Sequence, residues 1–324
     1  MTKLNFIEVC AGAGGMSTGF VDAGFSPVLL NDFDRICCET LRNNHPNVEV
    51  NHGCMKDINF SQYKDRVDVF VGGVPCQSFS QAGKRKGIDD PRGTLIYSFI
   101  DIVKEVCPKF FVIENVEGLQ SHNKGKTLKD IISTLTGIGK YKISYKVLNA
   151  NDYDVPQNRK RLFIVGNLGE YDFEFPKVSE NKPVLKDVLS DCPESDGIKY
   201  SELKESLFEK IPPGGCWVNL PEEDQKSYMG KSYNSGGGKR GILKRLDMNK
   251  PSLTILTSPS QKQTERCHPI YNRPLQVLES SRIQTFPDSY KFAGSRNQIY
   301  KQIGNAVPVK LAYHLAITIK KHLQ

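Results

Sequence analysis

The segment NFIEVCAGAGGMSTGF, residues 5–20, joins a short apolar run to a glycine-rich turn and then to a helical pattern. The apolar run predicts a buried strand that ends at Cys10. Gly12, Gly14 and Gly15 allow the backbone to bend sharply and to approach a ligand closely. A strand, a glycine turn and a helix in this order favour a nucleotide-like cofactor site, although a tight structural turn could use the same glycines.

The alternation of apolar runs and helical patterns continues through the first half of the chain. Further buried strands are predicted at 27–30, 67–71, 110–113, 143–148 and 161–166, and helices near 16–24, 34–44, 94–106 and 126–138. Strands that alternate with helices form βαβ units, so the sequence predicts an α/β fold with a mostly parallel sheet. Ligands of such sheets bind at the carboxyl ends of the strands, which directs attention to the residues there.

Two acidic residues follow the glycine turn. Asp32 ends the second predicted strand, where a carboxylate can accept hydrogen bonds from ribose hydroxyls. Its position favours cofactor binding over a purely structural turn, without saying which cofactor. Asp57, within CMKDIN (54–59), could accept a bond from an adenine amino group, but capping a helix is the more usual role of such a residue.

The segment VDVFVGGVPCQSFS (67–80) is a predicted strand that leads through two glycines to Cys76. A thiol at the carboxyl edge of the sheet would lie where substrates bind, and its thiolate is a strong nucleophile. A polar loop with several cations, 81–93, follows and would favour the thiolate. The alternative is a buried structural thiol, a role that suits a helix cysteine such as Cys37 better.

Two later segments, FFVIENVEGL (110–119) and VPQNRKRLFIVG (155–166), deliver further polar side chains to this edge. Glu114 follows a buried strand, where apolar surroundings should raise its pKa and let the carboxyl carry a proton at neutral pH. Arg159 and Arg161 alternate into a strand, so both can point to one face. The alternatives are an ion pair for Glu114 and a solvated strand edge for the arginines.

The composition changes after about residue 170, where Pro, Gly, Lys, Ser and Asp become frequent. This change predicts a second, smaller domain of irregular β structure over 172–290. Helical spacing returns at 308–323, and this last helix is expected to pack on the first domain. The predicted catalytic and cofactor-binding domain is therefore 1–171, completed by 291–324.

The bulk composition bounds the class of protein. The chain has 324 residues, of which 38% are hydrophobic, so a packed core is expected and disorder is not. A net charge of +8 fits a polyanionic partner. There is no apolar stretch of the ~20 residues that a membrane span needs, and no signal peptide is recognised. Nine cysteines without zinc-type C-x-x-C pairs predict free thiols, no metal site and a cytoplasmic location.

Six blocks, in family order, resemble the DNA (cytosine-5)-methyltransferase family. They are the glycine turn, the Pro-Cys loop, Glu-Asn-Val (114–116), the Q-x-R-x-R segment (157–161), RPLQVLESSRIQTFPD (273–288) and QIGNAVPVKLA (302–312). The resemblance implies a Rossmann-like methyltransferase domain that uses S-adenosylmethionine, and a smaller, irregular β-rich target-recognition domain. It also implies the modification enzyme of a restriction-modification system, from a bacterium, an archaeon or a phage, with a restriction endonuclease as its genetic partner.

For the cofactor, the resemblance implies that Phe6 stacks on the adenine, Asp32 holds the ribose, and Asp57 with Ile58 holds the adenine. The other cofactor residues that it implies are Cys10, Ala11, Gly12, Gly14, Gly15, Phe33, Pro75, Gln77, Asn305 and Ala306. Two positions depart from common family choices, with Asp32 where Glu is usual and Val74 where a larger or cyclic residue often precedes Pro75.

For the reaction, the resemblance implies that the Cys76 thiolate adds to C6 of a cytosine flipped out of double-stranded DNA. Glu114 would donate a proton toward N3, and Arg161 would orient that carboxyl, with Arg159 as a further catalytic candidate. The candidate DNA-binding residues are Ser80, Lys84, Arg85, Arg92, Lys239, Arg240, Arg245, Lys262, Thr264 and Arg266. The segment TSPSQKQTERCHP (257–269) is the candidate base-contacting stretch.

Other classes of protein fit less well. A zinc cytidine deaminase needs H-x-E and C-x-x-C, and an amino-group methyltransferase usually carries a D/N/S-P-P-Y/W loop, none of which occurs here. A tRNA-methylating branch of the same family would share the catalytic residues, although the long second domain favours DNA. A non-catalytic DNA-binding protein would not need Cys76, Glu114 and Arg161 together. The chain is expected to be a monomeric catalytic core without a preceding regulatory domain.

Overall fold

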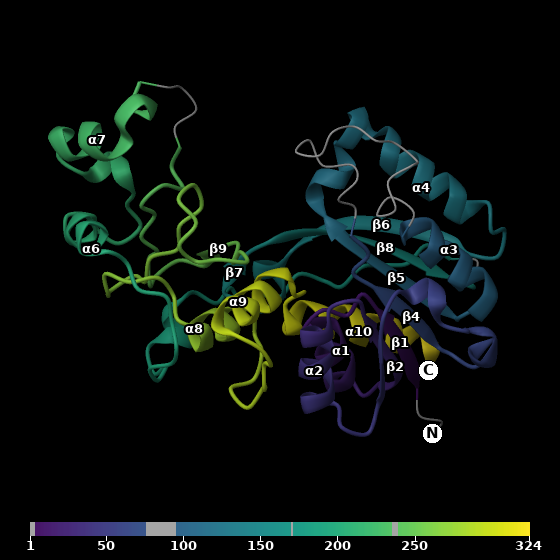
Figure 1. The fold of residues 1–324 in the computed structure, drawn as a ribbon. Coiled ribbons are helices and arrows are strands. Elements are labelled where there is room, and N and C mark those ends of the chain that lie inside the picture. The colour runs from purple at the N-terminus through teal and green to yellow at the C-terminus, as the bar shows by residue number, and fades with distance from the viewer. Residues whose placement is uncertain (1–3, 76–94, 170, 235–238) are drawn as a thin grey trace.

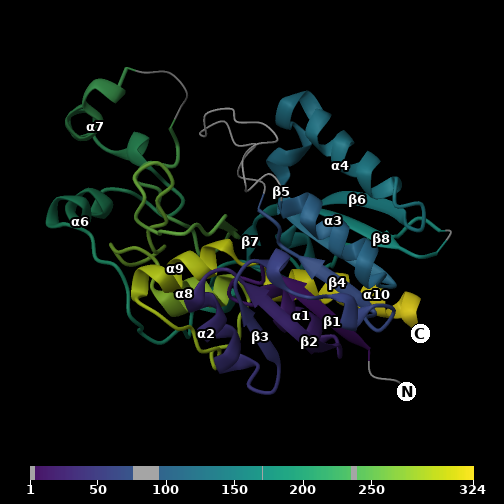
Figure 2. The same cartoon turned by 45° about the vertical axis from the view of Figure 1, so that its right-hand side comes forward.

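The computed structural model describes residues 4–75, 95–169, 171–234 and 239–324. These residues form two lobes (Figure 1). The larger lobe holds a seven-stranded sheet with helices on both faces. The smaller lobe carries the helices α6 and α7 on long loops, and α8 and α9 lie between them and the sheet (Figure 2).

The sheet has the strand order β3-β2-β1-β4-β5-β8-β6. Neighbours from β3 to β5 run parallel, and β8 runs antiparallel to both β5 and β6. The prediction of an α/β fold with a mostly parallel sheet is confirmed. The strands are β1 (Asn5–Val9), β2 (Ser26–Asp32), β3 (Glu49–His52), β4 (Val69–Gly72), β5 (Phe110–Val116), β6 (Lys142–Asn149) and β8 (Lys160–Asn167).

The helices of the larger lobe cover this sheet because each presents one apolar face to it. They are α1 (Gly15–Asp22), α2 (Arg35–Asn44), α3 (Leu95–Val106), α4 (Lys126–Thr136) and α10 (Val309–Leu323). One core joins β1 to α1 and α10, and the other joins the opposite sheet face to α3 and α4. α10 packs closely on α1 because Gly19 has no side chain, and a Cβ there would lie 2.6 Å from the Cβ of Ala312.

The smaller lobe differs from the irregular β structure expected there. The described part of 172–290 holds four α-helices and a single two-residue strand, together with short 3-10 turns. In SELKESLFE (201–209), acidic residues in the first turn and the buried Leu207 and Phe208 favour a helix. The elements are β7 (Gln157–Asn158), α5 (Lys186–Leu189), α6 (Glu202–Glu209), α7 (Glu222–Met229), β9 (Ser252–Leu253), α8 (Val277–Ile283) and α9 (Arg296–Asn305).

A network of buried hydrogen bonds joins the two lobes. Arg159 is 1% exposed and donates from Nη1 to the carbonyl of Ile255 (3.0 Å) and from Nη2 to that of Gly304 (2.9 Å). Beside it, Gln157 donates to Gln284 (2.9 Å), and β7 pairs in parallel with β9. Arg159 therefore joins two segments distant in sequence through their backbone carbonyl groups. The prediction of Arg159 as a further catalytic residue is corrected to this structural role, because its guanidinium group is buried.

Within the ranges given above, no helix is both long and apolar enough to cross a membrane.

Candidate functional site

A cleft of about 830 Å³ opens at the carboxyl ends of β1, β2, β4 and β5. Sequence reasoning placed the candidate residues at this edge, and the structure brings many of them together. The cleft is lined by the predicted residues Cys10, Ala11, Gly12, Asp32, Phe33, Pro75, Glu114, Arg161, Asn305 and Ala306. The residues come from the amino-terminal half and from the α9–α10 junction, so the cleft is completed by the end of the chain.

The glycine turn forms one wall of the cleft. Cys10, Gly12 and Gly14 all have positive φ, at 52°, 56° and 77°, and a β-carbon makes such a backbone unfavourable. The backbone N–H of Gly12 donates to Oδ2 of Asp32 (2.7 Å), and the N–H of Asp34 donates to Oδ1 (2.8 Å). Burial raises the pKa of Asp32, and these hydrogen bonds partly offset the shift.

The prediction that Phe6 stacks on an adenine is wrong. Phe6 is 0% exposed, and its ring packs 5.3 Å from that of Phe20 in the core beneath the sheet, so neither face can meet a ligand. The aromatic ring available in the cleft is that of Phe33, which is 78% exposed and directly follows Asp32.

Four other predicted cofactor residues do not line the cleft. Gly14 and Gly15 serve the turn itself, because a side chain at Gly15 would collide with the carbonyl of Val307. Asp57 ends the 3-10 turn Met55–Asp57 after β3, and Ile58 follows it. The assignment of both to the adenine stays a prediction.

Glu114 and Arg161 meet at the floor of the cleft from the antiparallel strands β5 and β8. The Nε of Arg161 lies 3.0 Å from Oε1 of Glu114, and both side chains are largely buried. Burial raises the pKa of Glu114, and the two arginines 161 and 159 counteract the shift. A carboxyl held this way can carry a proton nearer neutral pH than an exposed one.

Asn115 links this pair to the Pro-Cys loop. Its side-chain amide donates to the carbonyl of Val74 (2.9 Å), and the backbone N–H of Val116 donates back to its Oδ1 (2.9 Å). Pro75, the next residue, lines the cleft. Six predicted residues of this loop lie outside the described residues, namely Cys76, Gln77, Ser80, Lys84, Arg85 and Arg92.

Sequence reasoning missed two carboxyl groups in the cleft, those of Glu8 and Asp34. Glu8 lies within β1, is 1% exposed, and accepts a hydrogen bond from the hydroxyl of Ser17 on α1. Burial raises the pKa of Glu8 to about 8. The available signal was an acidic residue inside the otherwise apolar run NFIEV, which is rare without a functional or structural reason.

Two of the predicted DNA-binding residues are buried, so their predicted role is wrong. Arg245 is 4% exposed and donates to the carbonyls of Phe208 (2.5 Å) and His268 (3.3 Å), among others. Arg266 is 7% exposed and donates to the carbonyls of Thr254, Thr264 and Glu265. Both guanidinium groups therefore hold loops of the smaller lobe and cannot meet a phosphate or a base edge in this conformation.

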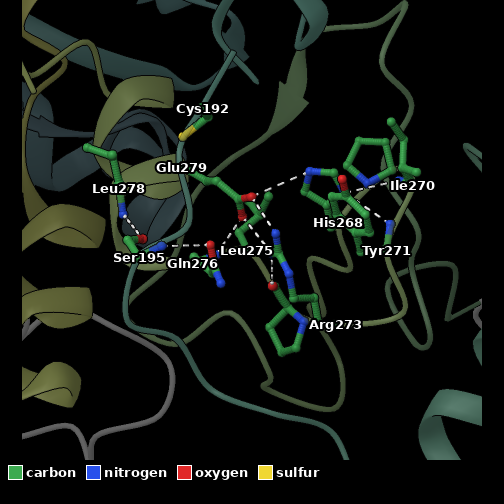
Figure 3. Close-up of polar contacts among 12 residues, drawn as sticks. Cys192, Ser195, His268, Ile270, Tyr271, Arg273, Leu275, Gln276, Leu278 and Glu279 are labelled. Carbon is green, nitrogen blue, oxygen red and sulfur yellow. Dashed lines mark hydrogen bonds and ion pairs between the residues drawn. The ribbon is translucent and has the colours of Figure 1, made fainter. Parts of the chain in front are cut away.

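The end of the predicted base-contacting segment 257–269 is also buried. Figure 3 shows His268, which is 3% exposed, between two backbone N–H groups and Glu279. Its Nδ1 accepts from Ile270 and Tyr271 (both 3.1 Å), and Nε2 lies 3.5 Å from Oε1 of Glu279. Arg273 holds the same carboxylate through two hydrogen bonds of 2.9 and 2.8 Å. Apart from the buried Pro259, the part of this segment left on the surface is 257–263.

The comparisons with known proteins agree with this geometry. The sequence profile of C-5 cytosine-specific DNA methylases matches residues 4–321. The chain is 47% identical to the type II methyltransferase M.Eco47II of Escherichia coli, over 95% of this chain and 76% of that protein. It is 45% identical to M.Sau96I of Staphylococcus aureus, over 98% of this chain and 76% of that protein.

Solved structures agree on the fold. The Entamoeba histolytica methyltransferase EhMeth superposes with a TM-score of 0.74 at 17% identity, over the whole of both chains. The S. pombe Dnmt2 methyltransferase superposes with a TM-score of 0.70 at 15% identity, over 99% of each chain. With a family profile over nearly its whole length and type II relatives at this identity, the chain belongs to the C-5 cytosine-specific DNA methylases and is a DNA cytosine-5 methyltransferase.

Proposed function

We propose that the chain transfers a methyl group from S-adenosylmethionine to C5 of a cytosine within one short sequence of double-stranded DNA. The reaction proceeds through a covalent bond between Cys76 and C6 of a flipped-out base, and the chain serves a restriction-modification system. The observation that carries the proposal is the buried Glu114–Arg161 pair, which shares one cleft with Asp32 and with Pro75, the residue before Cys76.

The cleft fits S-adenosylmethionine in size and charge. Its volume lies within the roughly 300–1,000 Å³ typical of small-molecule sites. Asp32 and Asp34 both line it, and carboxylate groups suit a cofactor that carries a sulfonium and an ammonium group. We assign the ribose to Asp32 and the adenine face to the exposed ring of Phe33. When bound, the cofactor supplies an electrophilic methyl group.

The remaining chemistry belongs to this chain. Addition of the Cys76 thiolate to C6 breaks the aromaticity of the cytosine and makes C5 electron-rich. Glu114 in its protonated form donates to N3, where negative charge develops, and Arg161 holds that carboxyl in place. Once C5 carries the methyl group, loss of the C5 proton, elimination of Cys76 as a thiolate and return of the N3 proton to Glu114 restore the base. The ring must be exposed for these steps, which requires the target to leave the stack.

We assign DNA contacts to those predicted DNA-binding residues of the smaller lobe that lie on its surface, which excludes the buried Arg245 and Arg266. These residues are Lys239, Arg240 and Lys262, from loops that follow α7 and β9. The prediction of Thr264 as a DNA contact is corrected, because its hydroxyl oxygen is buried. Lys262 lies on the exposed stretch 257–263, with its Nζ 5.1 Å from the ring centre of Tyr228. Cations on such loops contact phosphates, and neighbouring polar groups can meet base edges.

The test is expression in a bacterial host free of cytosine methylation, followed by bisulfite mapping of 5-methylcytosine across the genome. We expect protected cytosines in one short recurring sequence, absent when Cys76 is replaced by serine. A fully converted genome from soluble wild-type protein would overturn the DNA assignment. Methylation of tRNA in the same cells would then assign the chain to the RNA-modifying branch.

Replacing Asp32 with alanine is expected to weaken S-adenosylmethionine binding by about ten- to a hundredfold. The carboxylate orders Gly12 and, in our assignment, bonds the ribose, and hydrogen bonds to a charged group contribute roughly 1.5–3 kcal/mol each. Isothermal titration calorimetry measures the change. Asp130→Ala, at an exposed carboxyl on α4, is the matched control and should leave the affinity unchanged. Equal affinities for all three proteins would remove Asp32 from the cofactor site.

The buried and exposed cations of the smaller lobe are expected to respond differently to substitution. Arg245→Met leaves several buried carbonyls without a donor, so Tm should fall by roughly 5–10 °C. Lys262→Ala should leave Tm unchanged, weaken DNA binding, and reduce its salt dependence by about one released ion. Differential scanning calorimetry and salt-dependent binding measure the two effects. An unchanged Tm for the Arg245 variant would contradict its structural role.

A further inference from the structure

We propose that Tyr290 is a positioning residue for the cofactor, because its hydroxyl group holds the glycine turn from the opposite end of the chain. The inference rests on the proposed function only in taking S-adenosylmethionine as the ligand of the cleft. Tyr290 itself does not line the cleft. It acts through residues 11–14, of which Ala11 and Gly12 do line it.

The contact is specific to the turn. The Oη of Tyr290 donates to the carbonyl oxygen of Ala13 at 2.5 Å, across 277 residues of sequence. Gly14, with φ of 77°, leaves the space that this hydroxyl occupies, since a Cβ there would lie 2.8 Å from the Oη. The hydroxyl of Tyr290 therefore fits beside the turn only because residue 14 has no side chain.

The hydroxyl is held rigidly on the side away from the turn. The ring of Tyr290 packs 4.7 Å from Phe286 and 5.1 Å from Phe292, measured between ring centres. The next residue is fixed to α2, because the N–H of Lys291 donates to Asn44 (3.0 Å) and Asn44 donates back to its carbonyl (3.0 Å). Asn44 is the last residue of α2, so the segment that carries Tyr290 is held at the carboxyl end of the helix that follows Asp32 and Phe33.

The turn needs such a brace. Cys10, Gly12 and Gly14 occupy the left-handed region. A Cβ on Gly12 would have no heavy atom within 4 Å, so hydrogen bonds such as the one from its N–H to Asp32 (2.7 Å), rather than side-chain packing, hold that residue. Within the turn, the N–H of Gly14 donates to Ala11 (2.9 Å). A turn already fixed in the bound geometry loses less conformational entropy when the ligand arrives, which improves affinity. Removing the hydroxyl leaves the carbonyl of Ala13 without this donor.

The test compares Tyr290→Phe with Tyr300→Phe. Tyr300 is the matched control because it is 1% exposed and its hydroxyl also donates to a buried carbonyl, that of Leu275 at 2.7 Å. Calorimetric Kd values for S-adenosylmethionine and S-adenosylhomocysteine, Tm, and the kinetic constants are measured for both variants and the wild-type protein.

We expect Tyr290→Phe to raise both Kd values and the KM for the cofactor by about three- to tenfold, with kcat at saturating cofactor within about twofold of wild type. Tyr300→Phe should lower Tm but leave both Kd values unchanged. Equal Kd values for Tyr290→Phe and wild type, or an equal rise for both variants, would overturn the inference alone. Wild-type protein that fails to bind the cofactor would overturn the proposed function, and this inference with it.

Discussion

Replacing Cys76 with serine is expected to reduce methyl transfer at least about a thousandfold, equivalent to roughly 4 kcal/mol of transition-state stabilisation, while cofactor affinity stays at the wild-type value. A serine hydroxyl does not ionise near neutral pH, whereas a thiol beside cations does so readily. Without addition at C6, C5 keeps the low reactivity of an aromatic carbon. Single-turnover transfer of a radiolabelled methyl group to DNA from a methylation-free host measures the loss.

A covalent trap makes this prediction specific to Cys76. Fluorine at C5 cannot leave as a proton does, so DNA with 5-fluorocytosine at the target should accumulate as an adduct with the wild-type protein. The serine variant should form none. Cys192→Ser, at a partly buried thiol of the smaller lobe, is the matched control and should behave as wild type. An adduct with the Cys76 variant would assign the nucleophile to another residue.

The sheet could be predicted because its central strands β1, β4, β5 and β8 are buried on both faces and therefore appear as continuous apolar runs. All six predicted strands and the five predicted helices are present, with shifts of a few residues at their ends. β3 was missed because EVNH contains one apolar residue and pairs along one side only, at the edge of the sheet. An edge strand takes its stability from backbone pairing, which leaves little trace in composition.

Whether a site residue could be predicted depended on its position along a strand and on the direction of its side chain. Cys10, Asp32 and Glu114 end buried strands, and the parallel sheet carries such residues to one edge whatever their side chains. The prediction that Phe6 contacts the cofactor was wrong because side chains alternate between the two faces of a strand. The side chain of Phe6 points into the core between β1 and α1. Position within a motif does not reveal which side of the strand faces the ligand.

The arginines of the smaller lobe could not be sorted from sequence. Arg245 and Arg266 lie among glycines and polar residues, a composition typical of an exposed, cationic loop. A lobe with few strands must satisfy its backbone carbonyls by other means, and long side chains with several donors do so. Whether an arginine bonds carbonyls or DNA depends on packing between segments distant in sequence, such as 245 and 268–272.

Replacing Glu114 with glutamine is expected to lower kcat by about a hundred- to ten-thousandfold, the range for loss of a general acid. Glutamine keeps the size of the side chain and can still donate a hydrogen bond, but it has no proton to transfer to N3. Arg161 would also lose its carboxyl partner, whose Oε1 lies 3.0 Å from its Nε. Rapid-quench kinetics at saturating DNA and cofactor measure the change. Glu117→Gln, at a half-exposed carboxyl that pairs with Lys160, is the matched control.

The pH profile separates a proton donor from a structural carboxylate. Burial raises the pKa of Glu114, so its protonated form persists to higher pH than that of an ordinary carboxyl, and it is lost as pH rises through the folded-state pKa. Ionisation of Cys76 should make the wild-type rate rise with pH, and deprotonation of Glu114 should make it fall again at alkaline pH. In Glu114→Gln the alkaline fall should vanish and the residual rate should rise with pH alone. A parallel profile for both proteins would mean that Glu114 acts only by holding Arg161.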